Sequence, residues 1–358
     1  MISLVIPTYN EADNIPNLLC QIEQVLSEIE YEVLIVDDNS TDDTVGICAK
    51  LKNSYPLKLL QPGGRPRDLS LSVIDGCLAS QFDRVVVLDA DLSHPPDKIL
   101  LMLAQLDNNP DCFILGSRYF EGGSFDRQWS CWRFLNSYVA TAMARPLVRC
   151  TDPMSGFFML QKSRIDLSVC KPIGYKIGLE FMVRGDFRRV IEVPIGFKDR
   201  QIGESKMDLG QQFKYLRHLR RLYLVKLGGI GEFIHFGAVG ASGFVLDLVS
   251  YYGLQFFGVP HTLARSISFW PAVSWNWALN RVLTFGERTK RPKTRQWLEF
   301  VGSSLVGFAV NFGVYQHLTA EVGFFQRYHI AAFIAGIGCA SLFNFAASTL
   351  FVYSNKRG

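Results

Sequence analysis

Short apolar runs alternate with amphipathic segments over the first ninety residues of the chain. Runs of four or five apolar residues predict β-strands, and apolar positions recurring every three or four residues predict helices. This pattern predicts strands at 2–6, 32–36, 57–60 and 84–88, and helices at 14–29, 42–51 and 69–79. The alternating order predicts an α/β domain with a mostly parallel sheet and helices on both faces.

The last third of the chain carries very few charged residues. Its only Asp, Glu, Lys or Arg residues between 228 and 285, and between 299 and 353, are Glu232, Asp247, Arg265, Arg281, Glu299, Glu321 and Arg327. Each stretch is long enough for two membrane spans of about 20 residues. We therefore expect an all-α transmembrane domain of four helices, at 232–254, 262–284, 299–319 and 329–352.

This apolar region also repeats itself. FGAVGASGFVLD (236–247) resembles FVGSSLVGFAVN (300–311), and WNWALNRVLTF (275–285) resembles FNFAASTLFVY (343–353). The repeat predicts two tandem helical hairpins. Asp247 falls in the middle of a predicted span, where an acid is costly and usually functional. It either pairs with one of its candidate partners, Arg265 and Arg281, or faces a lipid path.

The segment before the first span is amphipathic. Its residues Phe213, Leu216, Leu219, Leu222 and Tyr223 fall at helical spacing with basic residues between them. This is typical of an interfacial helix on an anionic leaflet, although a helix packed on the preceding domain has the same pattern. We expect three parts, at 1–210, 211–228 and 229–358.

The distribution of charge predicts the orientation in the membrane. The loop 286–296 contains five Lys or Arg residues, and the C-terminus has two more. By the positive-inside rule, both termini and the first domain are expected in the cytoplasm. The net charge of +4 does not suggest nucleic acid, and the eight cysteines form no C-x-x-C motif that would indicate zinc. The N-terminus lacks the charged and long apolar regions of a signal peptide.

Polar residues follow three of the predicted strands, in PTYNE (7–11), DDNS (37–40) and DAD (89–91). Ligands of parallel sheets bind beyond the carboxyl ends of the strands, where these segments converge. No glycine-rich dinucleotide motif or P-loop is present. Extended backbone would point Asp89 and Asp91 to the same side, which is costly unless a positive group lies between them. Such an edge can hold a nucleoside diphosphate through a divalent cation, while solvated turns are the alternative.

Six motifs occur in order: IPTYNE (6–11), VDDNSTDDT (36–44), DADLSHPP (89–96), GSRY (116–119), DPMSGF (152–157) and R-x-x-G-E-S-K (200–206). Over residues 1–210 the chain resembles family-2 glycosyltransferases of the GT-A fold, and most of all the dolichol- or polyprenyl-phosphate mannose synthases. The membrane region is similar to GtrA-like four-span domains, including the N-R-x-x-T-F ending at 280–285.

The resemblance implies roles for individual residues. It implies a nucleotide-sugar pocket of Pro7, Tyr9, Glu11, Val36, Asp38, Asp89, Ala90, Asp91, Arg118, Arg200 and Lys206. A divalent cation, Mg²⁺ or Mn²⁺, would be held by Asp91 and Ser93, where some relatives carry Gln at position 93. The acceptor phosphate would be bound by Arg118, Arg133 and Ser137. Asp89, Asp91 and Arg118 would be catalytic.

The implied acceptor is a lipid phosphate. Enzymes that transfer sugar to a hydroxyl need a carboxylate base, but the Q-x-x-R-W and E-D motifs are missing, since Glu180 precedes Phe181. A phosphate monoester is already an anion and needs no base. We expect mannose to pass from GDP-mannose to dolichyl or polyprenyl phosphate with inversion. UDP-glucose as donor, a glycolipid-flipping role of the spans and a homo-oligomer stay open, and a chain-elongating synthase is disfavoured.

Two local features have open interpretations. Asp152 and Ser155 either line the acceptor site or shape the turn around Pro153. The segment QPGGRPRDLSLS (61–72) departs from the family pattern, and its Arg65 and Arg67 face either the membrane or the nucleotide.

Overall fold

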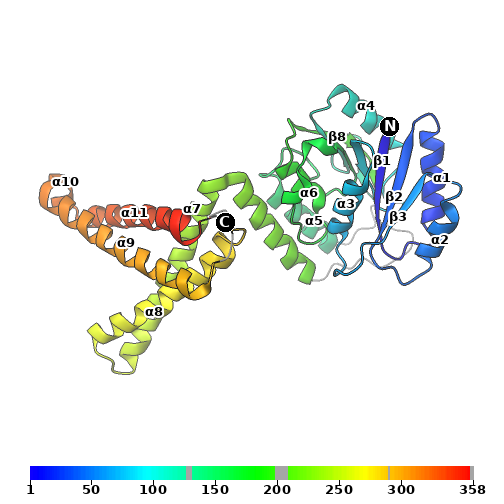
Figure 1. Ribbon diagram of the computed structural model, residues 1–358. Coiled ribbons are helices and arrows are strands. Elements are labelled where there is room, and N and C mark those ends of the chain that lie inside the picture. Colours follow the sequence, from blue (N-terminus) through cyan, green and yellow to red (C-terminus); the bar gives the residue numbers. More distant parts are fainter. Residues whose placement is uncertain (126–130, 198–208, 289–290, 355–358) are drawn as a thin grey trace. The chain divides into compact units, whose positions relative to one another are not determined.

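The computed structural model describes residues 1–125, 131–197, 209–288 and 291–354. It divides into two compact units, Met1–Lys226 and Leu227–Gly358 (Figure 1). The first unit contains the sheet, and the described part of the second is helical.

A seven-stranded mixed sheet forms the centre of the first unit, in the order β3-β2-β1-β4-β7-β5-β8. These strands are β1 (Ile2–Thr8), β2 (Tyr31–Asp37), β3 (Leu57–Leu60), β4 (Arg84–Val87), β5 (Phe113–Ser117), β7 (Phe158–Gln161) and β8 (Val190–Pro194). Only β7 runs antiparallel to its neighbours β4 and β5. A second sheet pairs β6 (Ser124–Phe125) with β9 (Gly196–Phe197). The predicted α/β domain with a mostly parallel sheet is confirmed.

Two apolar cores lie on opposite faces of this sheet. Side chains alternate along a strand, so Leu4 and Ile6 enter one core and Val5 the other. In Figure 1, α1 and α2 lie on one face and α3 and α6 on the other. The first core is covered by α1 (Ile15–Leu26), α2 (Thr44–Leu51) and α4 (Lys98–Asn108). The second is covered by α3 (Leu69–Ala79), α5 (Cys131–Ala144), α6 (Ile177–Arg184) and the 3₁₀ turn η2 (Leu167–Val169), while the 3₁₀ turn η1 (Lys162–Arg164) has no buried residue.

The predicted amphipathic segment forms the start of α7 (Leu209–Phe256), a helix that continues into the second unit. Leu219 and Leu222 are buried in the second core of the first unit, whereas Phe213 and Leu216 of the same predicted face are exposed. The helical backbone is interrupted at Gly228 (φ 53°, ψ −133°), a conformation that glycine adopts most readily. The apolar stripe is therefore divided between packing on the first unit and an exposed surface.

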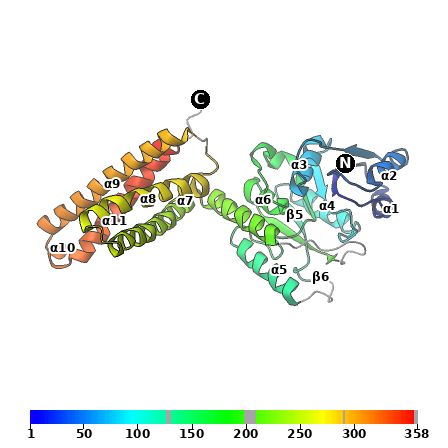
Figure 2. The same cartoon turned by 90° about the horizontal axis from the view of Figure 1, so that it is seen from below.

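The second unit contains the rest of α7, followed by α8 (His261–Leu279), η3 (Asn280–Thr284), α9 (Lys293–Glu321), α10 (Gly323–Arg327), α11 (His329–Ala347) and η4 (Ser348–Val352). The helices α9 and α11 pack side by side in both ribbon views (Figures 1 and 2). Both η3 and η4 are π-helical turns, and each directly follows a helix of one predicted hairpin.

The two hairpins share a close contact between a glycine and an asparagine. A Cβ atom on Gly243 would lie 2.1 Å from Asn276 Oδ1, and one on Gly307 would lie 2.2 Å from Asn344 Oδ1. Each asparagine comes four residues before its π-helical turn. The same glycine–asparagine contact at corresponding positions agrees with the tandem repeat seen in the sequence.

Three helical segments of the described chain are long and apolar enough to cross a membrane: 210–256, 293–321 and 329–352. The predicted span at 262–284 forms α8 and η3, but it is not among them. Arg265, Asn276 and three serines are spread along this helix, so it contains no long stretch as apolar as those within the three segments. The structure therefore supports a membrane region with three candidate spans, and the count of four is not confirmed.

Asp247 is paired within the second unit. Its Oδ2 accepts a hydrogen bond from Arg265 Nη1, while Arg281 instead donates to Gln296 and to the backbone oxygen of Arg291. Of the two candidate partners, Arg265 is the one that the structure selects.

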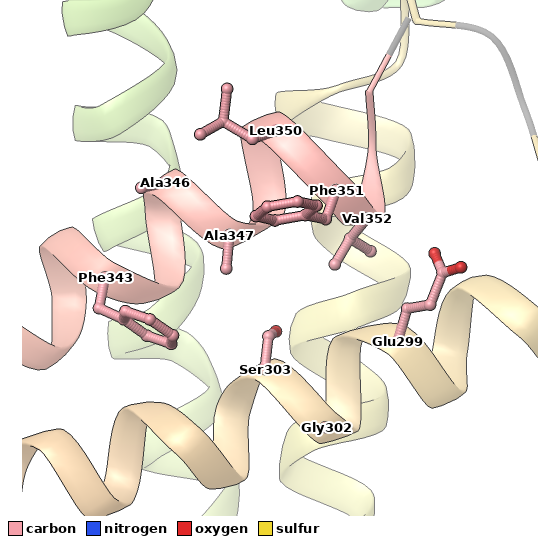
Figure 3. A pocket seen from close by; sticks show the side chains of 9 residues that line it. All are labelled: Glu299, Gly302, Ser303, Phe343, Ala346, Ala347, Leu350, Phe351 and Val352. Atoms are coloured by element: carbon pink, nitrogen blue, oxygen red, sulfur yellow. The ribbon is translucent and has the colours of Figure 1, made fainter. Parts of the chain in front are cut away.

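An apolar groove of about 400 Å³ lies between α9 and the end of α11 with η4 (Figure 3). Figure 3 shows Phe343, Leu350 and Phe351 along one wall and Ser303 on the other, with Glu299 at one end. Arg291 and Arg295 lie 3.3 and 3.0 Å from the Glu299 carboxylate oxygens, so the charge at this end is compensated.

Candidate active site

The loops after β1 and β2 are joined at the carboxyl edge of the sheet. Asn10 and Asn39 adopt positive φ angles of 56° and 60°, which asparagine tolerates better than most residues. Asn10 N–H donates to Ser40 Oγ at 2.9 Å, and Thr41 N–H donates to Asn10 Oδ1 at 2.7 Å. The predicted convergence of the PTYNE and DDNS segments is thus observed.

Asp38 presents a buried acceptor in this region. Its Oδ2 accepts the backbone N–H of Asp68 at 2.7 Å, while Oδ1 is buried without a hydrogen-bond partner in the described chain. The neighbouring Asp37 is also buried, with Oδ2 accepting from Ser40 N–H at 3.2 Å. A buried carboxylate oxygen without a donor is costly and calls for an explanation, such as a ligand that donates to it.

Arg67 lies over the ring of Tyr9, with its guanidinium carbon 4.0 Å from the ring centroid. Arg65 instead donates to Asp75 at 2.6 Å on α3. Nearby, Glu11 Oε2 accepts a hydrogen bond from Asn14 Nδ2 at 2.6 Å. Pro7 is the last residue but one of β1. Of the two arginines in QPGGRPRD, Arg67 packs on the tyrosine that is predicted to bind the nucleotide, and Arg65 pairs with Asp75 of α3.

Asp89 and Asp91 lie just beyond the end of β4. The strand ends at Val87, the turn begins at Ala90 between the two aspartates, and Leu92 has a positive φ of 60°. The strand therefore does not extend through both aspartates, and the shared direction of their side chains stays a prediction. Asp91 is 5% exposed and its Oδ1 accepts the Ser93 N–H at 3.1 Å, while the buried Ser93 Oγ has no hydrogen-bond partner in the described chain. Ala90 between the aspartates is also buried.

His94 holds this turn, a role that the sequence pattern did not predict. Its Nδ1 accepts the Asp89 N–H at 3.0 Å, and its ring stacks on Phe157 with a centroid distance of 5.2 Å. Burial lowers the pKa of His94, although Asp89 and Asp91 oppose this shift, so the ring is neutral with its proton on Nε2. The histidine of DADLSHPP was the available signal.

Arg118 and Asp152 form a buried ion pair. Arg118 Nε and Nη2 donate to the two carboxylate oxygens at 2.7 and 2.8 Å, and the Arg118 backbone N–H donates at 3.1 Å. Burial acts to lower the pKa of Arg118, but the hydrogen bonds and charge of Asp152 raise it above the ordinary value. Glu192 on β8 fixes this loop by accepting from Thr151 N–H at 2.9 Å. No sequence motif marked Glu192 for this role.

The segment 152–157 meets the Asp89 turn. A Cβ atom on Gly156 would lie 3.4 Å from His94 Cε1 and 3.6 Å from Asp89 Oδ2, so glycine permits this close approach. Ser155 Oγ accepts from Phe157 N–H at 3.3 Å, which is turn chemistry. Of the two open residues in DPMSGF, Asp152 holds Arg118 and Ser155 shapes the turn.

The predicted acceptor side is described in part. Ser137 on α5 lies 3.1 Å from the Tyr119 hydroxyl, which links the helix to the GSRY segment. The side chain of Arg133 and the residues Arg200 and Lys206 lie outside the described part of the chain.

Asp91 and Ser93 fit a cation that is shared with a phosphate ligand. In the described chain, no three His, Cys, Asp or Glu side chains gather as a complete metal site. Mg²⁺ is usually held by one or two carboxylates together with substrate phosphates and waters, so a full protein cage is not required. A buried carboxylate beside an unpartnered hydroxyl suits this arrangement.

Comparison with known proteins gives two family matches. Residues 3–171 match glycosyl transferase family 2, and residues 235–353 match the GtrA/DPMS transmembrane domain. Dolichol-phosphate mannosyltransferase of Pyrococcus furiosus is 34% identical over 88% of this chain and 89% of its own length. The protein of that name from Saccharomyces cerevisiae is 33% identical over 63% of this chain and 88% of its own length.

Among solved structures, glucosyl-3-phosphoglycerate synthase from Mycobacterium tuberculosis is 16% identical, with a TM-score of 0.48 over 64% of this chain and 80% of that one. The assignment rests on the family matches and on the curated relatives. The chain is a glycosyltransferase of family 2 and belongs, within it, to the dolichol-phosphate mannosyltransferase group.

Proposed function

We propose that this enzyme transfers mannose from GDP-mannose to the phosphate of a dolichyl or polyprenyl phosphate. An oxygen of the lipid phosphate attacks the anomeric carbon, the bond from that carbon to the diphosphate oxygen breaks, and GDP leaves with inversion. The names of the relatives favour mannose, and the GtrA/DPMS domain favours a lipid acceptor.

The pairing of Asp152 with Arg118 is the observation that supports a phosphate, and not a hydroxyl, as the acceptor group. This carboxylate belongs to the segment 152–157, whose Gly156 lies against Asp89, and a hydroxyl acceptor bound there would need a base. Both of its oxygens accept hydrogen bonds from the Arg118 guanidinium, so this carboxylate is already engaged and is not placed to take a proton from a hydroxyl. A phosphate acceptor is already an anion and needs no proton removed.

The other residues take roles that fit their surroundings. The buried Oδ1 of Asp38 accepts an N–H of the base, beside Tyr9 and the Pro7, Glu11 and Val36 positions. Asp91 and Ser93 hold a divalent cation, Mg²⁺ or Mn²⁺, which when bound neutralises charge on the diphosphate. Asp89 and Ala90 position the ribose and sugar. Arg118, with Arg133 and Ser137, binds the acceptor phosphate, and Arg200 and Lys206 bind the donor diphosphate.

We further propose that α8 with η3 is a fourth span. Its glycine–asparagine contact and π-helical turn correspond to those of the second hairpin. Four spans leave both termini on one side, and the basic loop 286–296 assigns that side to the cytoplasm. In this arrangement residues 1–210 form the catalytic domain, 211–228 an interfacial helix and 229–358 the membrane domain.

A transfer assay in membranes tests the function. With polyprenyl phosphate and Mg²⁺ or Mn²⁺ present, radiolabel from GDP-mannose is expected to enter a glycosyl-phosphoryl lipid. Mild acid should release the labelled sugar from this lipid. Incorporation from UDP-glucose alone would keep the mechanism and replace the donor. A membrane preparation with intact protein and no lipid label from either donor would refute the proposal.

Removing the Arg67 side chain tests the nucleotide side of the site. A cation over an exposed aromatic ring contributes about 0.5–1 kcal/mol, and this contact holds the Tyr9 ring in place. We expect Arg67→Ala to raise the KM for the nucleotide sugar about two- to fivefold with little change in kcat. Steady-state kinetics against donor concentration measure this, and Arg65→Ala is the comparison, since Arg65 pairs with Asp75 instead. An unchanged KM would show that Tyr9 needs no such support.

A further inference from the structure

Lys176 is a lysine at the candidate active site that no sequence motif identified. It directly precedes α6, and its Nζ donates to the Met154 backbone oxygen at 2.8 Å. Met154 belongs to the segment 152–157, in which Asp152 holds Arg118 and Gly156 lies against Asp89. The ammonium group is therefore placed within the same cluster as the residues proposed to bind the substrates.

No carboxylate of the described chain forms an ion pair with the Lys176 ammonium group. The charged or titratable groups that act on it or are acted on by it are Asp89, His94, Arg118 and Asp152. Asp152 gives both oxygens to Arg118, and Lys176 has no carboxylate within 4 Å in the described chain. Burial, followed by the charge of Arg118, lowers the pKa of Lys176 to about 8, while Asp152 and Asp89 oppose the shift. Its Nζ also lies 4.6 Å from the centroid of the Tyr175 ring, so its partners in the described chain are a carbonyl oxygen and an aromatic ring, and neither is an anion. An ammonium group withdrawn from water without an anion is costly, and such groups concentrate at functional sites.

A purely structural lysine in this chain has different surroundings. Lys162 also donates to a backbone oxygen, that of Ser80 at 2.7 Å, and to the Ser80 hydroxyl at 3.0 Å. Its backbone N–H bonds Asp83, which precedes β4, so it lies at the opposite end of that strand from Asp89. Lys176, in contrast, lies near a second cation, Arg118, which repels its charge. A lysine that only braced a loop would gain no stability from this position. Two neighbouring cations are stabilised together when an anion binds between them.

We propose that Lys176 is a substrate-binding residue that donates to a phosphate oxygen of one of the two anionic substrates. This proposal rests on the proposed sugar transfer from a nucleoside diphosphate to a lipid phosphate. Lysine acts on a phosphate as a point charge with rotatable donors, whereas arginine binds in a fixed planar fork. Lys176 thus supplements the fixed guanidinium of Arg118 with a cation that can turn from the Met154 oxygen to the ligand.

The test compares Lys176→Met and Lys176→Arg with the control Lys162→Met. A hydrogen bond to a charged group contributes about 1.5–3 kcal/mol, which predicts a loss of kcat/KM of about 10- to 100-fold in Lys176→Met. In the wild type, kcat/KM should fall as pH rises through about 8, because the lysine of the free enzyme then loses its charge. In Lys176→Arg this alkaline limb should move to higher pH, since arginine stays protonated. Lys162→Met is expected to lower the unfolding temperature and leave the pH profile unchanged.

Two further readouts identify the substrate that Lys176 contacts. If it binds the donor diphosphate, the Kd for GDP with Mg²⁺, measured by calorimetry, rises in Lys176→Met. If it binds the acceptor, that Kd is unchanged and the KM for polyprenyl phosphate rises. Active wild type with an unaltered Kd, KM and pH profile in both Lys176 variants would overturn the proposal. A wild-type protein that transfers no sugar would refute the proposed function. The Kd for GDP would then still test the donor-side role of Lys176. A raised Kd in the Lys176 variants would support that role, and an unchanged Kd would overturn it.

Discussion

Replacing Asp91 by asparagine is expected to abolish sugar transfer while the fold stays intact. Asp91 is the buried carboxylate proposed to hold the cation, and the cation's stabilisation of the departing diphosphate is of the order of several kcal/mol. A loss of about 4 kcal/mol corresponds to about a 10³-fold lower kcat. Radiolabel transfer from GDP-mannose at saturating Mg²⁺ or Mn²⁺ measures the effect.

The stability of the same variant separates function from folding. Asparagine keeps the Oδ1 acceptor for the Ser93 N–H, so the turn retains its hydrogen bond. It also removes a buried negative charge near Asp89, so we expect the unfolding temperature to stay the same or to rise. Asp97→Asn is a matched control, because Asp97 is exposed at the start of α4 and lies outside the proposed site. Full activity of Asp91→Asn would remove Asp91 from the cation site, and a large loss of stability would make the activity result uninformative about the metal.

The fold could be anticipated because its signals are local. Apolar runs and helical spacing marked β1 to β4 and α1 to α3 within a few residues of their observed ends. The position of β7 between β4 and β5 could not be anticipated, because strand order depends on contacts between distant segments. The four-residue run that forms β7 carries no mark of its direction.

The site was predictable where a motif supplies the side chain and not where packing does. The segments containing Asp38, Asp91 and Arg118 were visible in the sequence, and the structure places them at the edge of one sheet or beside it. His94, Glu192 and Lys176 act through tertiary neighbours: a stacked Phe157, a loop at Thr151 and the Met154 oxygen. A single histidine, glutamate or lysine has too many ordinary surroundings for its neighbours to be inferred from spacing. The same holds for Arg67, whose ring partner lies far away in sequence.

The Arg118–Asp152 pair is expected to matter for stability as well as for catalysis. Asp152 is completely buried, and the Arg118 side chain is 11% exposed. Removing one partner of such a pair leaves an uncompensated buried charge, which costs about 3–5 kcal/mol. We therefore expect Asp152→Ala to lower the free energy of unfolding by this amount, as measured by urea denaturation of the detergent-solubilised protein, and to lose transfer activity with it.

A double replacement separates the two roles of the pair. Arg118→Met with Asp152→Leu removes both charges and fills the space with apolar groups, which recovers most of the lost stability in comparable pairs. If Arg118 binds the acceptor phosphate, this stable double variant still transfers sugar at least about 100-fold more slowly, because a charged donor to the phosphate is missing. Its KM for polyprenyl phosphate should rise while GDP binding is retained. If the double variant instead regains both stability and activity, the pair serves only to hold the loop against Asp89, and the acceptor phosphate must be bound by other residues.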